Sequence, residues 1–316
     1  MKERALVTFI EDKEFLLAEV RNLYKSCRAA GITHNSDLVI CAPKNIWHKL
    51  PTDDFVVMLA SDSISDGNCS GAPCYDNVFK DYHFINSIHC LVEHADFLKQ
   101  YKFILRTDCD VFITPMFGDF FPSVFHTGIG AYNNEPEVAE KLQAIARRHG
   151  LRTKQQHNIG STWYGASSDV LECAALTMRM MHVLATEEFK DYEGKWPGWF
   201  KGVMLLYASD LAINHLFDEV VVSPKFDAHS DHKTPWRESE VMHIHCWHTD
   251  AAYSKFQFLA GKYAGMSTHE LDDRLIADYC MKVALSEGGD LKSQDDMIIL
   301  LVVVSALILS LVLCSL

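Results

Sequence analysis

Along the first hundred positions, short runs of apolar residues alternate with stretches in which apolar residues recur every three or four positions. Short continuous apolar runs, which are typical of buried strands, occur at 5–10, 36–42 and 55–60. Stretches with apolar residues three and four positions apart, which are typical of amphipathic helices, occur at 14–30 and 81–100. This strand–helix–strand rhythm predicts an α/β fold with a mostly parallel central sheet flanked by helices.

The pattern is looser after residue 115, but the same two spacings continue. We expect further helices at 138–149, 168–184, 208–217 and 268–284. We expect further strands at 128–132, 158–165, 220–223 and 241–248. A single domain over residues 1–285 accounts for all of these elements, and a short polar linker follows at 286–296.

The last part of the chain, Met297–Leu316, contains no charged residue and consists mainly of Ile, Leu and Val. A helix of this length spans roughly 30 Å, so we expect a transmembrane tail anchor. It would be a single-pass C-terminal anchor in an endomembrane such as the ER or Golgi, with the domain on the cytosolic side. Small residues at Ser286, Gly288 and Gly289 before an apolar tail also resemble a lipid-anchor signal. That route requires an N-terminal signal peptide, which the sequence does not show.

One apolar run is followed closely by two carboxylates. Phe103–Leu105 is typical of a buried strand, and Asp108 and Asp110 come after it. Side chains alternate along an extended chain, so the two carboxylates share one side and repel each other unless a cation or a proton intervenes. Oxygen ligands at the carboxyl end of a strand suit Mg²⁺ or Mn²⁺, and open α/β sheets bind ligands at that end. The alternative interpretation is a solvated turn with two surface acids.

Candidate partners for the carboxylate pair lie far downstream. The predicted strand at 241–248 carries His243, His245 and His248, and imidazole is a frequent metal ligand. We expect one of these histidines to be a ligand, with His245 and His248 preferred over His243. The chain has sixteen histidines, so the others are expected to be ordinary packed or surface residues.

Two further charged residues each have a structural and a functional interpretation. Asp210 follows Ser209 at the start of a predicted helix. It is either a helix-capping acid or an active-site carboxylate that orients or deprotonates an acceptor hydroxyl. Arg106 lies on the strand face of Asp108 and Asp110, where it either holds Asp108 in place or contacts a nucleotide.

Composition narrows the range of partners. The formal net charge is −13, and no basic stripe is visible, so a nucleic-acid partner is not expected. A bound metal would have to supply positive charge for an anionic substrate. The ten cysteines include no Cys-x-x-Cys pair, which argues against structural zinc. Cys69 and Cys74 could pair, but free thiols in a reducing compartment are the simpler interpretation.

The order of these features resembles glycosyltransferases of the GT-A fold over residues 5–250. The most specific part is the strand that ends in Arg106-Thr-Asp-Cys-Asp110, and the Gly-punctuated segment at 158–165, Ser209-Asp210 and a late histidine support it. The resemblance implies a UDP- or GDP-sugar donor whose diphosphate is bridged by Mn²⁺ or Mg²⁺. The acceptor would be a hydroxyl of a glycan, lipid or protein.

The resemblance also implies roles for individual residues. Asp110 would bind the metal directly, and Asp108 would bind it directly or through water, or hold the ribose. A histidine of the 243–248 segment would complete the metal shell, and Asp210 matches the position of an acceptor-side acid. Membrane-bound members mostly carry an N-terminal anchor, so the expected C-terminal anchor departs from the pattern and puts a lumenal role in doubt.

Three other functions compete with glycosyl transfer. A metal-dependent hydrolase would also use Asp and His residues, although it usually needs two metals and the sequence offers one centre. A nucleotidyltransferase is disfavoured because no Gly-rich phosphate loop follows the first strand. A membrane-tethered, non-catalytic binding protein on the same fold is the third alternative.

Overall fold

The computed structural model describes residues 2–67, 78–132, 134–152, 158–247 and 252–286. Its main sheet has seven strands in the order β3-β2-β1-β4-β7-β6-β8. Their bounds are β1 Arg4–Phe9, β2 Ser36–Ala42, β3 Val56–Ala60, β4 Phe103–Arg106, β6 Phe125–Ile129, β7 Ile159–Ala166 and β8 Val220–Val222. Only β7 runs antiparallel to its two neighbours, β4 and β6, and the other neighbouring pairs are parallel. The fold is therefore mixed α/β with a mostly parallel sheet.

A second, three-stranded sheet stands beside the first. It has the order β5-β10-β9, with β5 Val111–Ile113, β9 Ala228–His229 and β10 His243–His245. The turn of four residues between β4 and β5 connects the two sheets. The predicted strand at 241–248 is too long. Of its described residues, only His243–His245 form β10.

Helices cover both faces of the main sheet. Their bounds are α1 Glu14–Ala29, α2 Asn86–Glu93, α3 Ala95–Leu98, α4 Pro136–Arg148, α5 Ser167–Val183, α6 Met204–Leu216, α7 Lys255–Leu259 and α8 Ile276–Leu285. Ala5 and Val7 of β1 join the core cluster that contains residues of α2 and α5, whereas Leu6 joins the cluster of α1. This division follows from the alternation of side chains along a strand.

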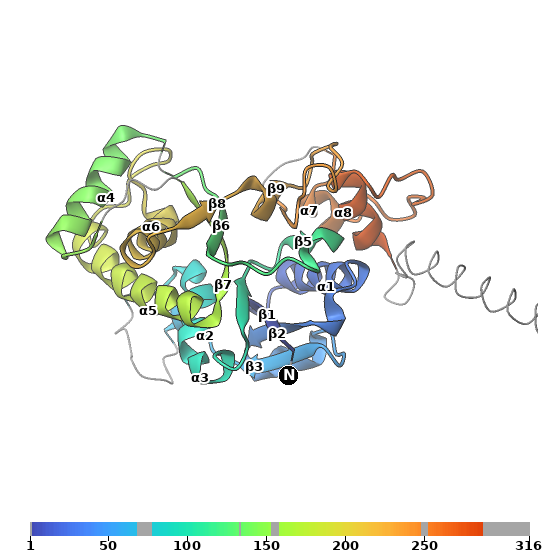
Figure 1. Cartoon of the computed structure of the whole chain (residues 1–316), viewed down its shortest axis with the longest axis horizontal. Helices are drawn as coiled ribbons and strands as arrows, with labels where there is room; N and C mark the ends of the chain where they lie inside the picture. Colours follow the sequence, from blue (N-terminus) through green and yellow to red (C-terminus); the bar gives the residue numbers. More distant parts are fainter. Residues whose placement is uncertain (1, 68–77, 133, 153–157, 248–251, 287–316) are drawn as a thin grey trace, which may run out of the picture.

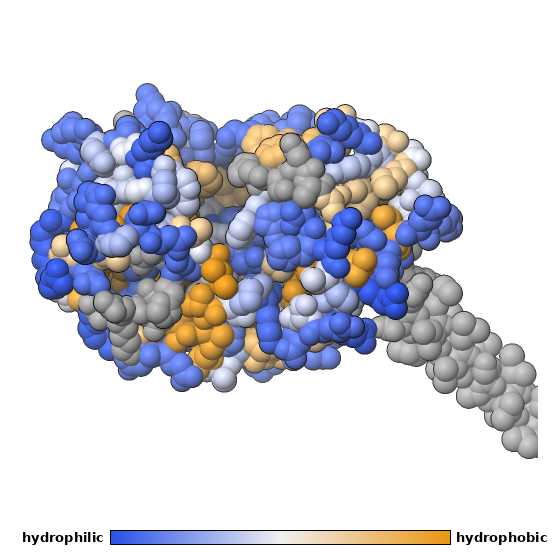
Figure 2. All heavy atoms as spheres, turned by 90° about the horizontal axis from the view of Figure 1, so that it is seen from above, coloured by the Kyte–Doolittle hydropathy of each residue, from blue (hydrophilic) through white to orange (hydrophobic). Residues whose placement is uncertain are grey.

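Figure 1 shows how the helices are distributed around the sheets. The helices α4, α5 and α6 lie together at one end, and α7 and α8 lie at the other end beside the small sheet (Figure 1). A third core cluster, which includes Phe112 of β5, Ile244 of β10 and Tyr279 of α8, joins the small sheet to α8. The face seen in Figure 2 is mostly hydrophilic, with an apolar patch near its middle.

The expected transmembrane helix is not supported. The fold class and the single-pass endomembrane localisation, which both depended on that helix, are corrected accordingly. Within the described ranges, no helix has the length and apolar character needed to cross a bilayer. The longest α-helix there, α5, has 17 residues and includes charged ones such as Asp169 and Arg179. The segment 297–316 itself lies outside the described residues, as do positions 287–296 of the predicted linker.

The cysteines that the structure describes are all buried and none is in a disulfide. They are Cys27, Cys41, Cys90, Cys109, Cys173, Cys246 and Cys280. Cys69 and Cys74, the pair that the sequence suggested, lie outside the described residues.

Candidate metal centre

The turn that carries the Asp-x-Asp motif lies where the direction of winding of the main sheet reverses. From β1 the chain passes through α1 to β2 and then to β3 on one side, and β4 is added on the other side of β1. Open α/β sheets bind ligands outside the carboxyl ends of the strands at such a switch point. Asp108 and Asp110 follow the carboxyl end of β4, so they stand at the position that this rule favours.

Asp108 is fixed by two hydrogen bonds from neighbouring strands. Arg106 donates from Nη2 to Oδ1 over 2.9 Å, and Ser161 of β7 donates from Oγ to Oδ2 over 2.8 Å. The Arg106 guanidinium is almost fully buried and also donates to Ser87 and to the carbonyl of Ser161. Of its two interpretations, the structure therefore places Arg106 as the residue that holds Asp108.

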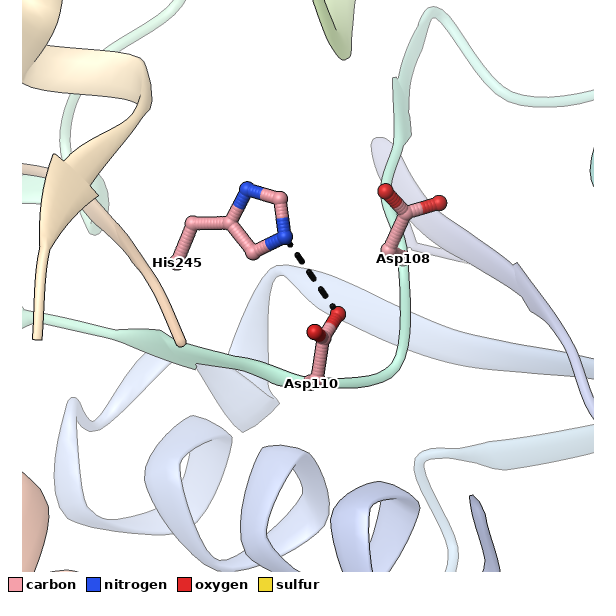
Figure 3. A group of neighbouring side chains, drawn as sticks. All are labelled: Asp108, Asp110 and His245. Atoms are coloured by element: carbon pink, nitrogen blue, oxygen red, sulfur yellow. Dashed lines mark ion pairs between the residues drawn. The ribbon is translucent and has the colours of Figure 1, made fainter. Parts of the chain in front are cut away.

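Asp110 faces a histidine from the small sheet. Nε2 of His245 lies 3.5 Å from Oδ1 of Asp110, because β10 pairs antiparallel with β5 and sets His245 opposite Val111. One ligand atom from each of Asp108, Asp110 and His245 lies within 4.8 Å of the other two. Figure 3 shows the three side chains converging from the β4–β5 turn and β10. Two carboxylates and one imidazole suit Mn²⁺ or Mg²⁺, so the donor set fits the cation that the sequence suggested.

Lys255, the first residue of α7, neutralises part of this acidic group. Its Nζ lies 2.5 Å from Oδ2 of Asp110 and 3.9 Å from Oε1 of Glu19. Burial alone would raise the pKa of Asp110, but His245 and Lys255 outweigh it and hold this pKa well below its ordinary value. Burial opposes the charged form of His245, yet Asp110 and Asp227 raise its pKa well above its ordinary value. A cation that binds His245 must therefore displace a proton.

Asp227 sets the orientation of His245. Its Oδ1 accepts a hydrogen bond of 2.8 Å from Nδ1 of His245, which leaves Nε2 to face Asp110. Glycines on two strands make room for this carboxylate. A Cβ atom at Gly128 or Gly160 would lie 2.8 Å from Oδ2 of Asp227, closer than real Cβ contacts allow. Gly128 of β6 and Gly160 of β7 thus leave the space that the Asp227 carboxylate occupies.

We expect Asp227→Asn to weaken Mn²⁺ binding about 10- to 100-fold, the usual effect of losing a carboxylate that supports a metal-bound histidine. The side-chain amide of asparagine is neutral, so it holds the His245 ring less well in the orientation that leaves Nε2 for the metal. Titration with Mn²⁺, followed by electron paramagnetic resonance of the unbound ion, measures the affinity. Asp272→Asn, which changes a half-buried carboxylate paired with Arg274, is the matched control and should bind as the wild type does. Unchanged affinity in Asp227→Asn would contradict this role.

His243, the second of the three candidate histidines, is not part of the Asp–Asp–His group. Nε2 of His243 hydrogen-bonds Oγ1 of Thr107 over 2.8 Å, and the side chain is fully buried. Burial lowers the pKa of His243 to about 4, so it is a neutral core residue. His248 lies outside the described residues.

Asp210 is not at a helix start, and it is not part of the Asp–Asp–His group. Helix α6 begins at Met204, so Asp210 lies in its second turn and the capping interpretation is wrong. Its carboxylate is buried, with Oδ2 accepting from the Tyr132 hydroxyl over 2.6 Å and Oδ1 accepting from Asn214 over 3.0 Å. Tyr132 in turn accepts a hydrogen bond from the amide of Ile159 at the start of β7. These contacts tie α6 to the sheet.

Burial raises the pKa of Asp210 from 3.8 to about 6, and hydrogen bonds from Tyr132 and Asn214 oppose the shift. The folded protein therefore binds a proton more tightly than the unfolded chain, and this group's contribution to stability falls as the pH rises from about 4 to about 6. We expect the stability of Asp210→Asn relative to wild type to increase by about 2 kcal/mol between pH 4.5 and 7.5. Urea unfolding at both pH values tests this. A difference that does not change with pH would contradict it.

The fold is an α/β domain whose Asp–Asp–His group, a set of side chains that could hold a metal ion, lies at the switch point of its sheet. The chain is a member of the family described as a domain of unknown function, DUF7164, whose model matches residues 5–295. No curated protein matches it.

Proposed function

We propose that the protein is a metal-dependent glycosyltransferase that moves a sugar from a nucleotide-sugar donor to an acceptor hydroxyl. The observation that carries the proposal is the convergence of Asp108, Asp110 and His245 at the carboxyl end of β4, next to β1. A site at this edge of the sheet is suited to a nucleotide, whose base and ribose can lie along the strand ends while the diphosphate reaches the acidic turn.

Each residue of the site has a role in this reaction. Asp108, Asp110 and His245 would hold Mn²⁺ or Mg²⁺, which supplies Lewis-acid stabilisation of the charge that develops on the leaving diphosphate. Arg106 keeps Asp108 aimed at the centre, and Asp227 does the same for His245. Lys255 carries a positive charge within reach of Asp110, where it adds to the stabilisation of a polyanionic ligand.

Nucleotide binding that depends on Mn²⁺ tests the proposal directly. We expect UDP or GDP to raise the melting temperature of the protein in the presence of Mn²⁺ and not in EDTA, because a ligand that binds only the folded state stabilises it by mass action. A panel of UDP- and GDP-sugars then identifies the donor through release of nucleoside diphosphate. Hydrolysis of simple phosphate esters without nucleotide binding would favour a hydrolase instead. If neither nucleotide changes the melting temperature, the donor-site assignment fails.

A further inference from the structure

A second group of side chains borders the candidate metal centre on the side of β9. His229 is the last residue of β9 and stands opposite His245 in the parallel pairing of β9 with β10. Residues paired in register point to the same face of a sheet, so the two imidazoles are neighbours. His229 nevertheless does not belong to the Asp–Asp–His group, which takes its one imidazole from His245.

Trp247 lies against both imidazoles. Its ring centroid is 4.9 Å from that of His229, with the planes 76° apart, and 6.0 Å from that of His245, with the planes 90° apart. These are edge-to-face contacts of the kind that fix an aromatic ring in one orientation. The side chain remains 38% exposed, so part of the indole surface is open to a ligand next to the metal centre.

A carboxylate lies beside His229 and pairs with its Nδ1 by charge, without the geometry of a hydrogen bond. Nδ1 of His229 forms this ion pair with Oδ1 of Asp231, two residues along the chain. His232 stacks on it, with ring centroids 5.7 Å apart and planes 28° apart. An imidazole whose one nitrogen faces a carboxylate can accept a proton at the other nitrogen, which is the arrangement of a general base and the group that orients it.

We propose that His229, Asp231 and Trp247 form the acceptor subsite, that the acceptor is a neutral sugar, and that His229 is the catalytic base. This inference rests on the proposed glycosyl transfer. A tryptophan face suits the apolar C–H face of a sugar ring, and the His–Asp pair suits its hydroxyls. The carboxylates of Asp231 and of the neighbouring Asp–Asp–His group place negative charge beside this subsite, which disfavours an anionic acceptor. Asp210, the acceptor-side acid that the sequence suggested, is buried in contacts with Tyr132 and Asn214.

The reaction step balances with these groups. The acceptor oxygen forms a bond to the anomeric carbon of the donor sugar while the bond from that carbon to the diphosphate oxygen breaks. The electron pair of the broken bond leaves with the nucleoside diphosphate. The proton of the acceptor hydroxyl passes to Nε2 of His229, and Asp231 stabilises the resulting imidazolium at Nδ1.

The test separates the acceptor subsite from the donor site. Calorimetry with UDP and GDP in Mn²⁺ compares the wild type with four variants, which are His229→Gln, Asp231→Asn, Trp247→Ala and Trp247→Phe. Sugar transfer is then measured with methyl glycosides of glucose, galactose, mannose and xylose. Trp196→Ala is the matched control, because Trp196 is similarly exposed but lies in the loop before α6.

We expect every variant to bind nucleotide as the wild type does. His229→Gln should lower kcat about 10²- to 10⁴-fold, the usual contribution of a general base, and Asp231→Asn should lower kcat with KM unchanged. Trp247→Ala should raise the acceptor KM about tenfold and Trp247→Phe much less, because the phenyl ring preserves stacking. Trp196→Ala should leave both constants unchanged.

Two kinds of failure can be distinguished. Wild-type kcat in both His229→Gln and Asp231→Asn, or a wild-type acceptor KM in Trp247→Ala, overturns the acceptor subsite and leaves the proposed function standing. Transfer to peptide or lipid hydroxyls but to none of the methyl glycosides overturns the sugar class of the acceptor. Absence of Mn²⁺-dependent nucleotide binding in the wild type overturns the proposed function, and the acceptor subsite with it.

Discussion

The Asp110→Asn variant should bind Mn²⁺ more than about 100-fold more weakly than the wild type and should lose nucleotide-sugar turnover to the same degree. Asp110 is one of the two carboxylates of the Asp–Asp–His group, so its substitution removes one of the two negative charges that would hold a cation there. Loss of a residue that merely supports a metal ligand costs about 10- to 100-fold in affinity, and loss of a direct ligand should exceed that.

Asparagine has nearly the size of aspartate, so the backbone bond from the amide of Cys246 to the carbonyl of residue 110 should persist and the protein should fold. Calorimetry with Mn²⁺ and assays of nucleoside diphosphate release give the two readouts. Asp54→Asn, which neutralises an exposed carboxylate, is the control and should match the wild type in both. Wild-type Mn²⁺ affinity in Asp110→Asn would refute the assignment of the metal centre.

The Arg4→Met variant should lose about 3–5 kcal/mol of unfolding free energy, because each buried acceptor left without a donor costs about 1–3 kcal/mol. Arg4 is the first residue of β1 and is completely buried. Its guanidinium donates to the carbonyls of Phe117, Gly118 and Phe120 at 2.9–3.1 Å. It also donates to the Tyr164 hydroxyl, so one side chain joins β1 to the segment after β5 and to β7.

Unfolding in urea, followed by circular dichroism, measures this loss. Arg4→Lys keeps the charge but not the planar set of donors, so we expect its stability to lie between those of Arg4→Met and the wild type. Arg274→Met is the control, because Arg274 is exposed and pairs only with its neighbour Asp272 among the contacts described for it. If Arg4→Met and Arg274→Met unfold at the same urea concentration, Arg4 does not hold these segments together.

Elements defined by short-range patterns could be predicted from the sequence. Residues 5–10 and 36–42 correspond to β1 and β2, and 14–30 corresponds to α1, because continuous apolar runs and helical spacing are local properties. The position of Asp108 and Asp110 after a buried strand was visible for the same reason. The start of α6 was not, because the apolar residues from Met204 onward carry no capping signal.

Residues that reach the site through the small sheet could not be predicted. Asp227 and Lys255 meet His245 and Asp110 only because β9, β10 and α7 come together beside β5, and no local pattern indicates that assembly. The sequence reduced the histidine ligand to a choice among three. His245 reaches the two carboxylates through its register opposite Val111, which is a property of the folded sheet, and His248 lies outside the described residues. Apolar composition at 297–316 suggested a membrane anchor, and no helix within the described residues supports one.

The two halves of the metal centre lie far apart in the chain, and this separation has a consequence for biosynthesis. Lys255 and Asp110 are 145 positions apart, and the β5–β10 pairing closes a loop of similar length. Contacts between such distant residues form late in folding, because the chain loses entropy when the loop closes before it gains the free energy of the contacts themselves. A nascent chain that has emerged only as far as β8 would hold Asp108 and Asp110 without His245. If the Asp–Asp–His group holds a cation as we propose, binding would require that synthesis has passed β10 and that the small sheet has formed, and truncated products would not bind the metal.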